Sequence, residues 1–423
     1  MTAIDFYILL VDNILLYIIS LIIVGSLYYA LIKNIVKSIL DPIFIQLVAA
    51  AFANTIPLFL FFCGVISYKY IFYLICIESI FWIGYFTFSK KNISFNEYEI
   101  CETKASFEIY KIMLALCIPS YLLTYIFLGI PILKDTYTET FSGGGGWGLL
   151  EHFQKFSSFF VITYSYYLLG IKKNRLLAKI SMSLMIIFCL LSGSKSAILI
   201  FAYTYFFYLY YYQHRSFNFK KYKKLILLVC LFPLIIIMTH SQSGLSNSSL
   251  LLIQRVVGYG DMYWMALPNN IMEEVTINNP YTYLFQGILG PLRLIDYSSF
   301  DANLGIQLKD IVYPDLDVQF APNSRLALLG WISFGWGGLI LSFILGSTFA
   351  FIRTRLSSLL PNGIIPVIIY GYIYSQFISV LTDPILAIGK FFSIMIFLII
   401  LWFTLYLFYG KTIKLKKIKQ VIT

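Results

Sequence analysis

Charged residues are scarce in this sequence. Asp, Glu, Lys and Arg together make up 12% of its 423 residues, which is about half their share in an average soluble domain. Hydrophobic residues make up 59%, and aromatic residues alone make up 18%. A chain with so few polar groups cannot cover its surface in water, so lipid is the solvent that fits it. We therefore expect an all-α polytopic membrane protein.

Cysteine is also rare, and its positions exclude two kinds of site. Five of the six cysteines fall inside apolar runs, the sixth lies in a polar link, and none follows Thr239 in the longest polar segment. We therefore expect no disulfide framework, and the Cys/His spacing of a metal site is missing. The first cation, Lys33, follows the first apolar run, so the basic start of a cleavable signal peptide is not seen. No metal or cofactor is expected.

What the sequence does contain is a series of apolar runs. A helix needs about 20 apolar residues to cross the hydrocarbon core of a bilayer. About eleven runs approach or exceed this length, at residues 6–32, 41–66, 70–89, 110–130, 156–171, 176–192, 196–212, 225–239, 327–352, 363–382 and 385–409. These runs predict about eleven transmembrane helices.

The links between the runs are alternately rich and poor in Lys and Arg. About 22 of the 31 cations fall in every second link. Because cytoplasmic loops carry the excess of positive charge, the N-terminus is predicted to be periplasmic and the C-terminus cytoplasmic. The net charge of +11 thus follows topology and does not indicate nucleic acid. The predicted organisation is 1–239 with helices 1–8, 240–326 as a periplasmic loop with short helices, and 327–423 with helices 9–11 and a basic tail.

The long periplasmic loop carries few cations. It holds four of them and eight acids, so its net charge is four minus eight, or −4, in a chain of net +11. Arginine at a few points in such a loop suits a bidentate grip on phosphate or carboxylate. The alternative is that these arginines pair with nearby aspartates and hold the loop together. The arginines in question are Arg255, Arg293 and Arg325.

A second candidate anion site is the hairpin Ser192-Gly193-Ser194-Lys195-Ser196-Ala197 between two predicted spans. Its Gly and Ser residues expose backbone N–H groups at the start of a helix, where anions bind. Lys195 would suit a diphosphate there, or would simply extend its ammonium group to the interface. His152 and His240 are the histidines on the outer side, and either is a candidate proton acceptor or an ordinary surface residue.

Three ionisable residues fall within or at the edge of predicted spans. Glu78 lies near the middle of the third run, and Asp383 and Lys390 lie two helical turns apart near the outer end of the last. Ionisable groups inside a membrane are costly and mark functional sites by default. The structural alternatives are a protonated Glu78 bonded to a neighbouring helix and an Asp383–Lys390 pair.

The layout of the chain resembles the O-antigen polymerase (Wzy) family. The resemblance lies in the many spans, the single dominant outer loop late in the chain and the Ser-Gly-Ser-Lys-Ser-Ala hairpin before it. The stretch Ala321-Pro322-Asn323-Ser324-Arg325, followed by Gly330, Phe334-Gly335 and Gly337-Gly338, also resembles that family's return from the loop into the membrane. The resemblance implies a GT-C-like fold in the bacterial inner membrane.

The resemblance also implies a reaction and its partners. The substrates would be undecaprenyl-diphosphate-linked oligosaccharides on the periplasmic face, with membrane lipids and a chain-length regulator protein as further partners. Arg255, Arg293, Arg325 and Lys195 would bind the diphosphate, and His240 or Asp261 would accept a hydroxyl proton. Trp147, Tyr259 and Trp264 would stack on sugar rings. No cofactor or metal is needed.

Two other functions remain open from the sequence. An O-antigen ligase shares the donor and the side of action, and only its acceptor differs. A flippase or other transporter of lipid-linked oligosaccharides is the second alternative, which Glu78 and Lys390 would suit. An outer segment of some 87 residues and the lack of inverted repeats argue against transport.

Overall fold

The computed structural model describes residues 1–90, 104–133, 147–194, 197–215, 259–290, 292–315, 322–360 and 363–409. Every regular element in these ranges is helical, which confirms the all-α class. The helices before residue 216 are α1 (Ala3–Asp12), α2 (Ile14–Ile35), α3 (Pro42–Phe62), α4 (Tyr68–Phe88), α5 (Lys104–Leu128), η1 (Pro131–Leu133), α6 (Trp147–Gly170), α7 (Arg175–Leu191), α8 (Leu199–Phe206) and the π-helix η3 (Phe207–Tyr212).

Short helices follow in the long loop, and longer ones return to the bundle. The loop contains α11 (Asp261–Ala266), η4 (Pro268–Glu273), α12 (Pro280–Leu284), α13 (Gln286–Leu289), η5 (Tyr297–Ser299) and α14 (Leu304–Val312). The last part contains α15 (Leu326–Phe334), η6 (Gly335–Gly337), α16 (Gly338–Phe351), η7 (Ile352–Leu356), α17 (Ser357–Leu359), α18 (Ile364–Phe377), η8 (Ile378–Leu381) and α19 (Pro384–Tyr409). The prediction of short helices within 240–326 therefore fits residues 259–315.

The protein is a polytopic membrane protein by the length and composition of its helices. Within the described ranges, six helical stretches are long and apolar enough to cross a membrane: Ile14–Ile35, Pro42–Phe62, Tyr68–Phe88, Ser106–Leu133, Leu326–Leu359 and Ile364–Leu381. Helices α6, α7, and α8 with η3 coincide with the predicted spans 156–171, 176–192 and 196–212. The predicted span 225–239 lies outside the described residues, so the count of eleven stays a prediction.

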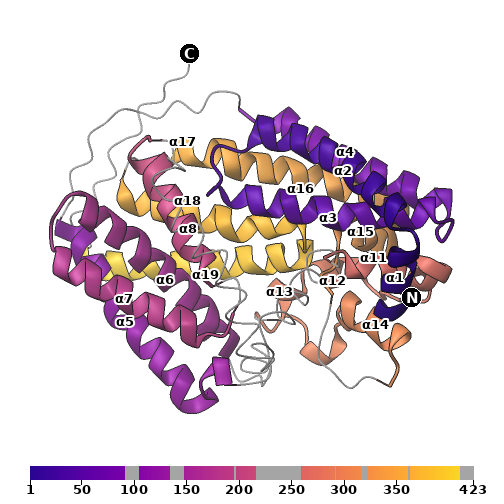
Figure 1. The fold of residues 1–423 in the computed structure, drawn as a ribbon. Coiled ribbons are helices and arrows are strands. Elements are labelled where there is room, and N and C mark those ends of the chain that lie inside the picture. The colour runs from indigo at the N-terminus through magenta and orange to yellow at the C-terminus, as the bar shows by residue number, and fades with distance from the viewer. Residues whose placement is uncertain are drawn as a thin grey trace.

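The long helices form two groups that α18 and α19 join. Helices α2, α3, α4 and α16 pack side by side, and α5, α6 and α7 form the second group (Figure 1). Helix α18 packs on α6 and on α19 between them. The loop helices α11–α14 gather at one end of the first group, next to the N-terminus (Figure 1).

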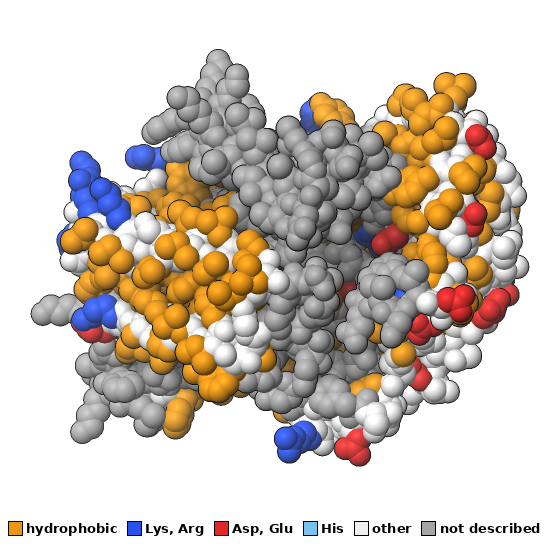
Figure 2. Space-filling model, turned by 60° about the horizontal axis from the view of Figure 1, so that its bottom comes forward, with side chains coloured by type: hydrophobic (Ala, Val, Ile, Leu, Met, Phe, Trp, Pro, Cys, Tyr) orange, Lys and Arg blue, Asp and Glu red, His pale blue; other side chains and the backbone are white. Residues whose placement is uncertain are grey.

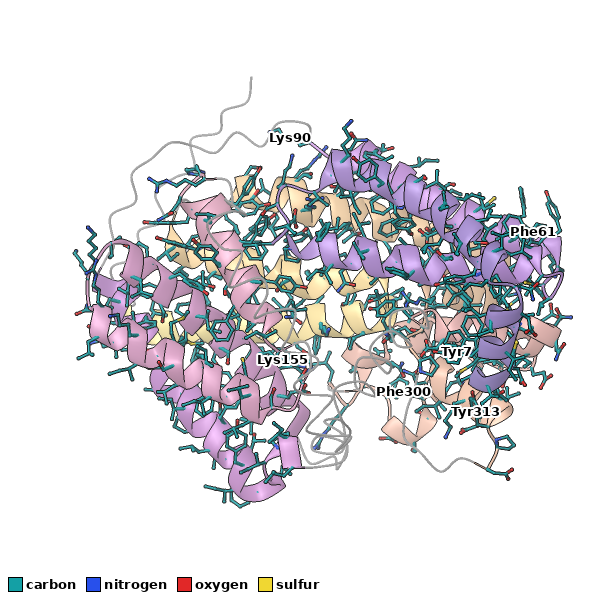
Figure 3. The ribbon with its side chains drawn as sticks, viewed as in Figure 1. Tyr7, Phe61, Lys90, Lys155, Phe300 and Tyr313 are labelled. Carbon is teal, nitrogen blue, oxygen red and sulfur yellow. The ribbon has the colours of Figure 1, made fainter. Side chains whose placement is uncertain are left out.

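The surface carries the pattern expected of a protein in lipid. Hydrophobic side chains cover wide areas in Figure 2. The exposed apolar side chains of the protein include Leu116 and Ile126 of α5 and Leu176 of α7. In the same view most Asp and Glu side chains lie toward the end with the loop helices, whereas Lys and Arg are more frequent at the opposite end. Figure 3 places Lys90 and Phe61 at opposite ends of the first group of helices.

A buried ion pair fastens the first group at the end opposite the loop helices. Arg353 donates to Asp41 Oδ2 at 2.8 Å and to the carbonyl oxygen of Ile35 at 2.7 Å, and also to Tyr85 Oη at 3.1 Å. Tyr374 Oη donates to Asp41 Oδ1 at 2.8 Å. Arg353 and Asp41 are 3% and 1% exposed. Since a buried charge is tolerated only when it is paired and hydrogen-bonded, this cluster links α2, α3, α4, η7 and α18 in one register.

The predicted span 327–352 falls within the candidate span Leu326–Leu359, but its helix is interrupted at Gly335, which corrects the expectation of one continuous helix. Helix α15 ends at Phe334, Gly335 takes a left-handed φ of +54°, and α16 begins at Gly338. A Cβ on Gly338 would lie 2.7 Å from the Cα of Gly330, although in a straight helix these residues would be about 12 Å apart. The chain therefore folds back at Gly335. Tyr73 of α4 donates to the carbonyl oxygen of Gly335 at 3.0 Å and holds the turn.

We expect the Arg353→Met variant to be destabilised by about 3–5 kcal/mol, because it leaves the carboxylate of Asp41 buried without its partner. Arg355→Met is the matched control, since Arg355 lies two residues away and is exposed. Thermal melting of the purified proteins in one detergent measures the effect. Equal melting temperatures for both variants would show that the ion pair does not fasten the bundle.

Candidate functional site

The long loop returns to the middle of the helix bundle at Gly260. A Cβ at this position would lie 2.8 Å from the carbonyl oxygen of Ala53 and 2.8 Å from Ile56 Cδ1. Ala53 lies midway along α3, so the loop backbone reaches the central level of a candidate membrane-spanning helix. Only glycine permits this approach, because any side chain would meet the backbone of α3.

Arg325 lies beside this point of entry. Its Nη2 donates to the carbonyl oxygen of Tyr259 at 2.6 Å, and its guanidinium carbon lies 4.9 Å from the centre of the Tyr259 ring. Arg325 is 2% exposed, and its Nε has no hydrogen-bond partner. Among the described residues no carboxylate forms an ion pair with it. The guanidinium thus retains an unused donor in apolar surroundings.

The N-terminus of α15 adds to the positive potential at Arg325. Arg325 occupies the N-cap position, and no side chain caps the helix. The first N–H groups of a helix have no partner within it, and they attract anions together with the positive end of the helix dipole. Because α15 folds back from Gly335, its N-terminus points toward the interior of the protein. The same arrangement of half-helices binds anions in membrane transporters.

Asp261 lies in the same region and interacts electrostatically with Arg325. Burial raises the pKa of Asp261 to about 6, although a hydrogen bond from the backbone N–H of Met262 and the charge of Arg325 partly oppose this rise. A carboxyl group with a pKa near the working pH can accept and return a proton. Asp261 is the first residue of α11, next to Gly260, so the entry of the loop places it there.

A chain of polar groups crosses the spans beneath α11. Tyr263 Oη donates to Asn54 Oδ1 at 3.1 Å, and Asn54 Nδ2 donates to Tyr28 Oη at 2.7 Å. Tyr28 Oη in turn lies 3.4 Å from Glu78 Oε2. The expectation that Glu78 bonds to a neighbouring helix agrees with this contact, since Tyr28 belongs to α2. The chain connects the first loop helix to three candidate spans.

Ser324, the residue before Arg325, connects this region to the N-terminus of α19. Ser324 Oγ donates to Asp383 Oδ1 at 2.9 Å, and the same oxygen accepts the backbone N–H of Leu386 at 3.0 Å. Asp383 therefore caps the N-terminus of α19. Two helix N-termini meet at this point: that of α19 is occupied by a carboxylate, whereas that of α15 is open.

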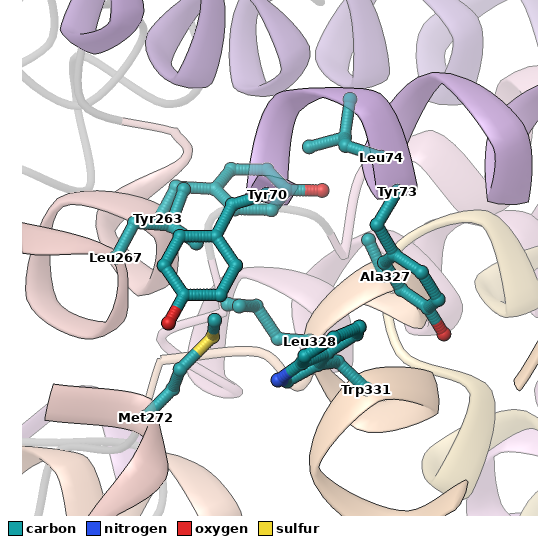
Figure 4. A pocket seen from close by; sticks show the side chains of 9 residues that line it. All are labelled: Tyr70, Tyr73, Leu74, Tyr263, Leu267, Met272, Ala327, Leu328 and Trp331. Carbon is teal, nitrogen blue, oxygen red and sulfur yellow. The ribbon is translucent and has the colours of Figure 1, made fainter. Parts of the chain in front are cut away.

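A small pocket lies between α4, α11 and α15. Four of its nine lining residues are aromatic, namely Tyr70 and Tyr73 of α4, Tyr263 of α11 and Trp331 of α15 (Figure 4). Tyr70 Oη at the edge donates to Glu273 Oε1 at 2.7 Å. Rings with polar groups at their edge suit the stacking of a sugar.

Compared with protein-family models, curated proteins and solved structures, the chain has no match.

The structure brings together three of the predicted site residues, namely Tyr259, Asp261 and Arg325. Trp264 is buried and stacks on Phe6 of α1 with ring centres 4.2 Å apart, so it faces the protein interior and not an outer cavity. Arg293 is exposed, with a φ of +53°, whereas Arg325 is buried. Lys195, Arg255 and His240 lie outside the described residues, as does the side chain of Trp147.

Three residues of the site were not among the predicted site residues. Asn54 and Tyr28 were hidden in apolar runs, although an amide in the middle of a span is itself a signal. Ser324 appeared only as part of a motif. In the described part of the chain no group of three His, Cys, Asp or Glu residues is arranged to hold a metal ion. The site is therefore a cationic guanidinium, an open helix N-terminus and a titratable carboxyl.

We expect the Asp261→Asn variant to melt at a higher temperature than the wild type at pH 7.5. The folded pKa of about 6 lies above the ordinary value of 3.8, so the ionised carboxylate opposes folding above pH 6 and this cost falls as the pH falls. The difference should shrink between pH 7.5 and pH 5 in thermal melts of the purified protein. Asp12→Asn, at an exposed carboxyl, should show no such trend; a lower melting temperature for Asp261→Asn at pH 7.5 would contradict the assignment.

Proposed function

We propose that the chain is a glycosyltransferase that polymerises polyprenyl-diphosphate-linked oligosaccharide repeat units, O antigen or a similar surface glycan. The observation that carries the proposal is Arg325, a buried guanidinium with no carboxylate partner among the described residues and with a free Nε. Such a group needs an anion, and the uncapped N-terminus of α15 favours the same charge. A lipid diphosphate supplies that anion at the depth where its isoprenoid chain stays in the membrane.

The proposed reaction is a direct glycosyl transfer. The hydroxyl of the acceptor sugar attacks the anomeric carbon of the growing chain and forms the new C–O bond. The bond between that carbon and the diphosphate oxygen breaks, and polyprenyl diphosphate leaves with the electron pair. Asp261 accepts the hydroxyl proton. No cofactor or nucleotide sugar enters this balance.

Arg325 lowers the barrier because the diphosphate gains negative charge as it leaves. One guanidinium contact at about 4 Å and an effective dielectric near 20 is worth roughly 4 kcal/mol. The ring of Tyr259 covers the guanidinium in the structure, so in this proposal it moves aside when the diphosphate binds. In this proposal the small pocket beside Tyr70, Tyr73 and Trp331 widens to admit a sugar ring.

The proposal includes a location and a topology. The protein would lie in the bacterial inner membrane with about eleven spans, a periplasmic N-terminus and a cytoplasmic C-terminus. The separation of acidic and basic side chains toward opposite ends in Figure 2 supports this orientation. The loop helices α11–α14, which lie beside the N-terminus in Figure 1, would then face the periplasm.

We expect the Arg325→Gln variant to lose about 100-fold or more of its polymerising activity, because it removes the proposed contact with the leaving group. The measurement is the length of surface glycan made in cells that lack the wild-type gene, with protein amounts checked by immunoblot. A polymerase defect leaves single repeat units on the lipid core, whereas a ligase defect leaves bare core. Arg355→Gln is the exposed control, and normal glycan ladders from normal amounts of Arg325→Gln would overturn the proposal.

A further inference from the structure

The loop helix η4 brings polar side chains to the start of α4, at the end of the bundle where Figure 3 places Phe61. Tyr70 Oη donates to Glu273 Oε1 at 2.7 Å and also lies 3.0 Å from Asn270 Oδ1. Because a hydroxyl has one proton, it donates to one of these acceptors at a time. In the part of the chain that the structure describes, Glu273 Oε2 and the amide nitrogen of Asn270 have no hydrogen-bond partner. Both groups are exposed and can bind a ligand.

Lys69 and Trp331 complete this group of side chains. Lys69 Nζ lies 4.6 Å from the centre of the Trp331 ring and 3.9 Å from Glu273 Oε1. The second distance is too long for a direct hydrogen bond. The ammonium group therefore lies between a carboxylate and an indole ring without being fixed to the carboxylate. Since the side chains of Lys69 and Glu273 are 54% and 51% exposed, Lys69 can leave this position when a ligand enters.

The backbone of η4 is kinked where it approaches Tyr70. Asn269 and Asn270 both take left-handed conformations, with φ of +55° and +58°. Two consecutive residues of this kind are unfavourable for side-chain-bearing amino acids and persist only where the surrounding structure fixes them. Met272, which is 2% exposed, anchors η4 in the core and lines the pocket between α4, α11 and α15. The kink and this anchor place Asn270 and Glu273 together beside α4.

Helix α15 connects this group to the proposed diphosphate site. Arg325 is the N-cap of α15, and Trp331 follows it by six residues, or about 9 Å along the helix axis. The pocket between α4, α11 and α15 is lined by Ala327, Leu328 and Trp331 of the same helix (Figure 4). An oligosaccharide that begins at a diphosphate beside Arg325 and follows α15 therefore passes the pocket and reaches Trp331.

The chemistry of the group suits a sugar better than a lipid headgroup. An indole ring offers a face on which a sugar ring can stack, while a carboxylate oxygen accepts from one hydroxyl and an amide N–H donates to the next. The charged side chains here are two carboxylates, Glu273 and Glu274, and one ammonium group, Lys69. Their sum is −1, which opposes the binding of a lipid phosphate or an acidic sugar.

We propose that Asn270, Glu273 and Trp331 form a carbohydrate subsite, which binds a neutral sugar of the oligosaccharide through two adjacent hydroxyl groups. Lys69 leaves the indole ring as the sugar binds. This inference rests on the proposed function, because the glycan is taken to extend from a diphosphate at Arg325. The subsite makes the enzyme selective for its repeat unit, since polar groups placed to bind hydroxyls are left unpaired by a sugar that lacks them.

The test is oligosaccharide binding by the purified protein in nanodiscs, measured as a change in tryptophan fluorescence. The probes are oligosaccharides made by partial acid hydrolysis of the surface glycan of the cells that produce the protein. We expect Glu273→Ala and Asn270→Gly to bind them at least about tenfold more weakly than the wild type, because each variant loses a hydrogen bond to the sugar. The matched controls Glu274→Ala and Asn269→Gly change exposed neighbours and should bind within about twofold of the wild type. Glycine keeps the left-handed backbone at both asparagine positions.

Equal affinities within either matched pair, or no binding by the wild type, would overturn the inference. If Glu273→Ala melts at a lower temperature than Glu274→Ala, the two asparagine variants decide. Loss of oligosaccharide binding when phosphatidylglycerol is added to the nanodisc would assign the group to a lipid headgroup and overturn the subsite as well. The probes carry no diphosphate, so the two proposals can fail separately. Normal glycan ladders in Arg325→Gln cells contradict the proposed function, whereas lost ladders without oligosaccharide binding by the wild type contradict the subsite alone.

Discussion

The ion pair between Arg353 and Asp41 fixes the positions of the helices of the first group along one another. Its partners come from the end of α2, the start of α3, the end of α4 and the last turn of α18, and each contributes a hydrogen bond that a shift of one residue would break. The fixed register brings the mid-helix residues Asn54 and Glu78 to the same depth, where the loop meets them. A buried charged pair is stable only with close contacts and complete hydrogen bonding. The stability of the bundle and the geometry of the site therefore depend on the same contact.

Non-helical backbone at the depth of the membrane is permitted only where protein surrounds it. The structure meets that condition by removing side chains where segments approach: Gly260 against Ala53 of α3, and Gly338 against Gly330. The left-handed turn at Gly335 then directs α15 inward instead of outward. The result is a helix N-terminus and a guanidinium in a low-dielectric interior, where their attraction for an anion is much stronger than at an aqueous surface.

The sequence predicted the class, most of the described long helices, and three residues that meet in the site. It failed at Gly335 because hydropathy measures how apolar a run is and not the direction in which the chain continues. It placed Trp264 at an outer cavity because an amphipathic aromatic suits an interface equally well, and only the packing of α1 on α11 decides that its ring stacks on Phe6. The alternative of an Asp383–Lys390 pair followed from spacing on one helix, whereas the side chain that hydrogen-bonds to Asp383 is Ser324, which is distant in sequence.

The partners of Asp383 distinguish the N-terminus of α19 from that of α15. Asp383 Oδ1 accepts from the hydroxyl of Ser324 and from the N–H of Leu386 in the first turn of α19. Because α19 is capped by this carboxylate and α15 is uncapped, only the Arg325 side gains from a helix N-terminus, which suits the site where negative charge increases during a reaction.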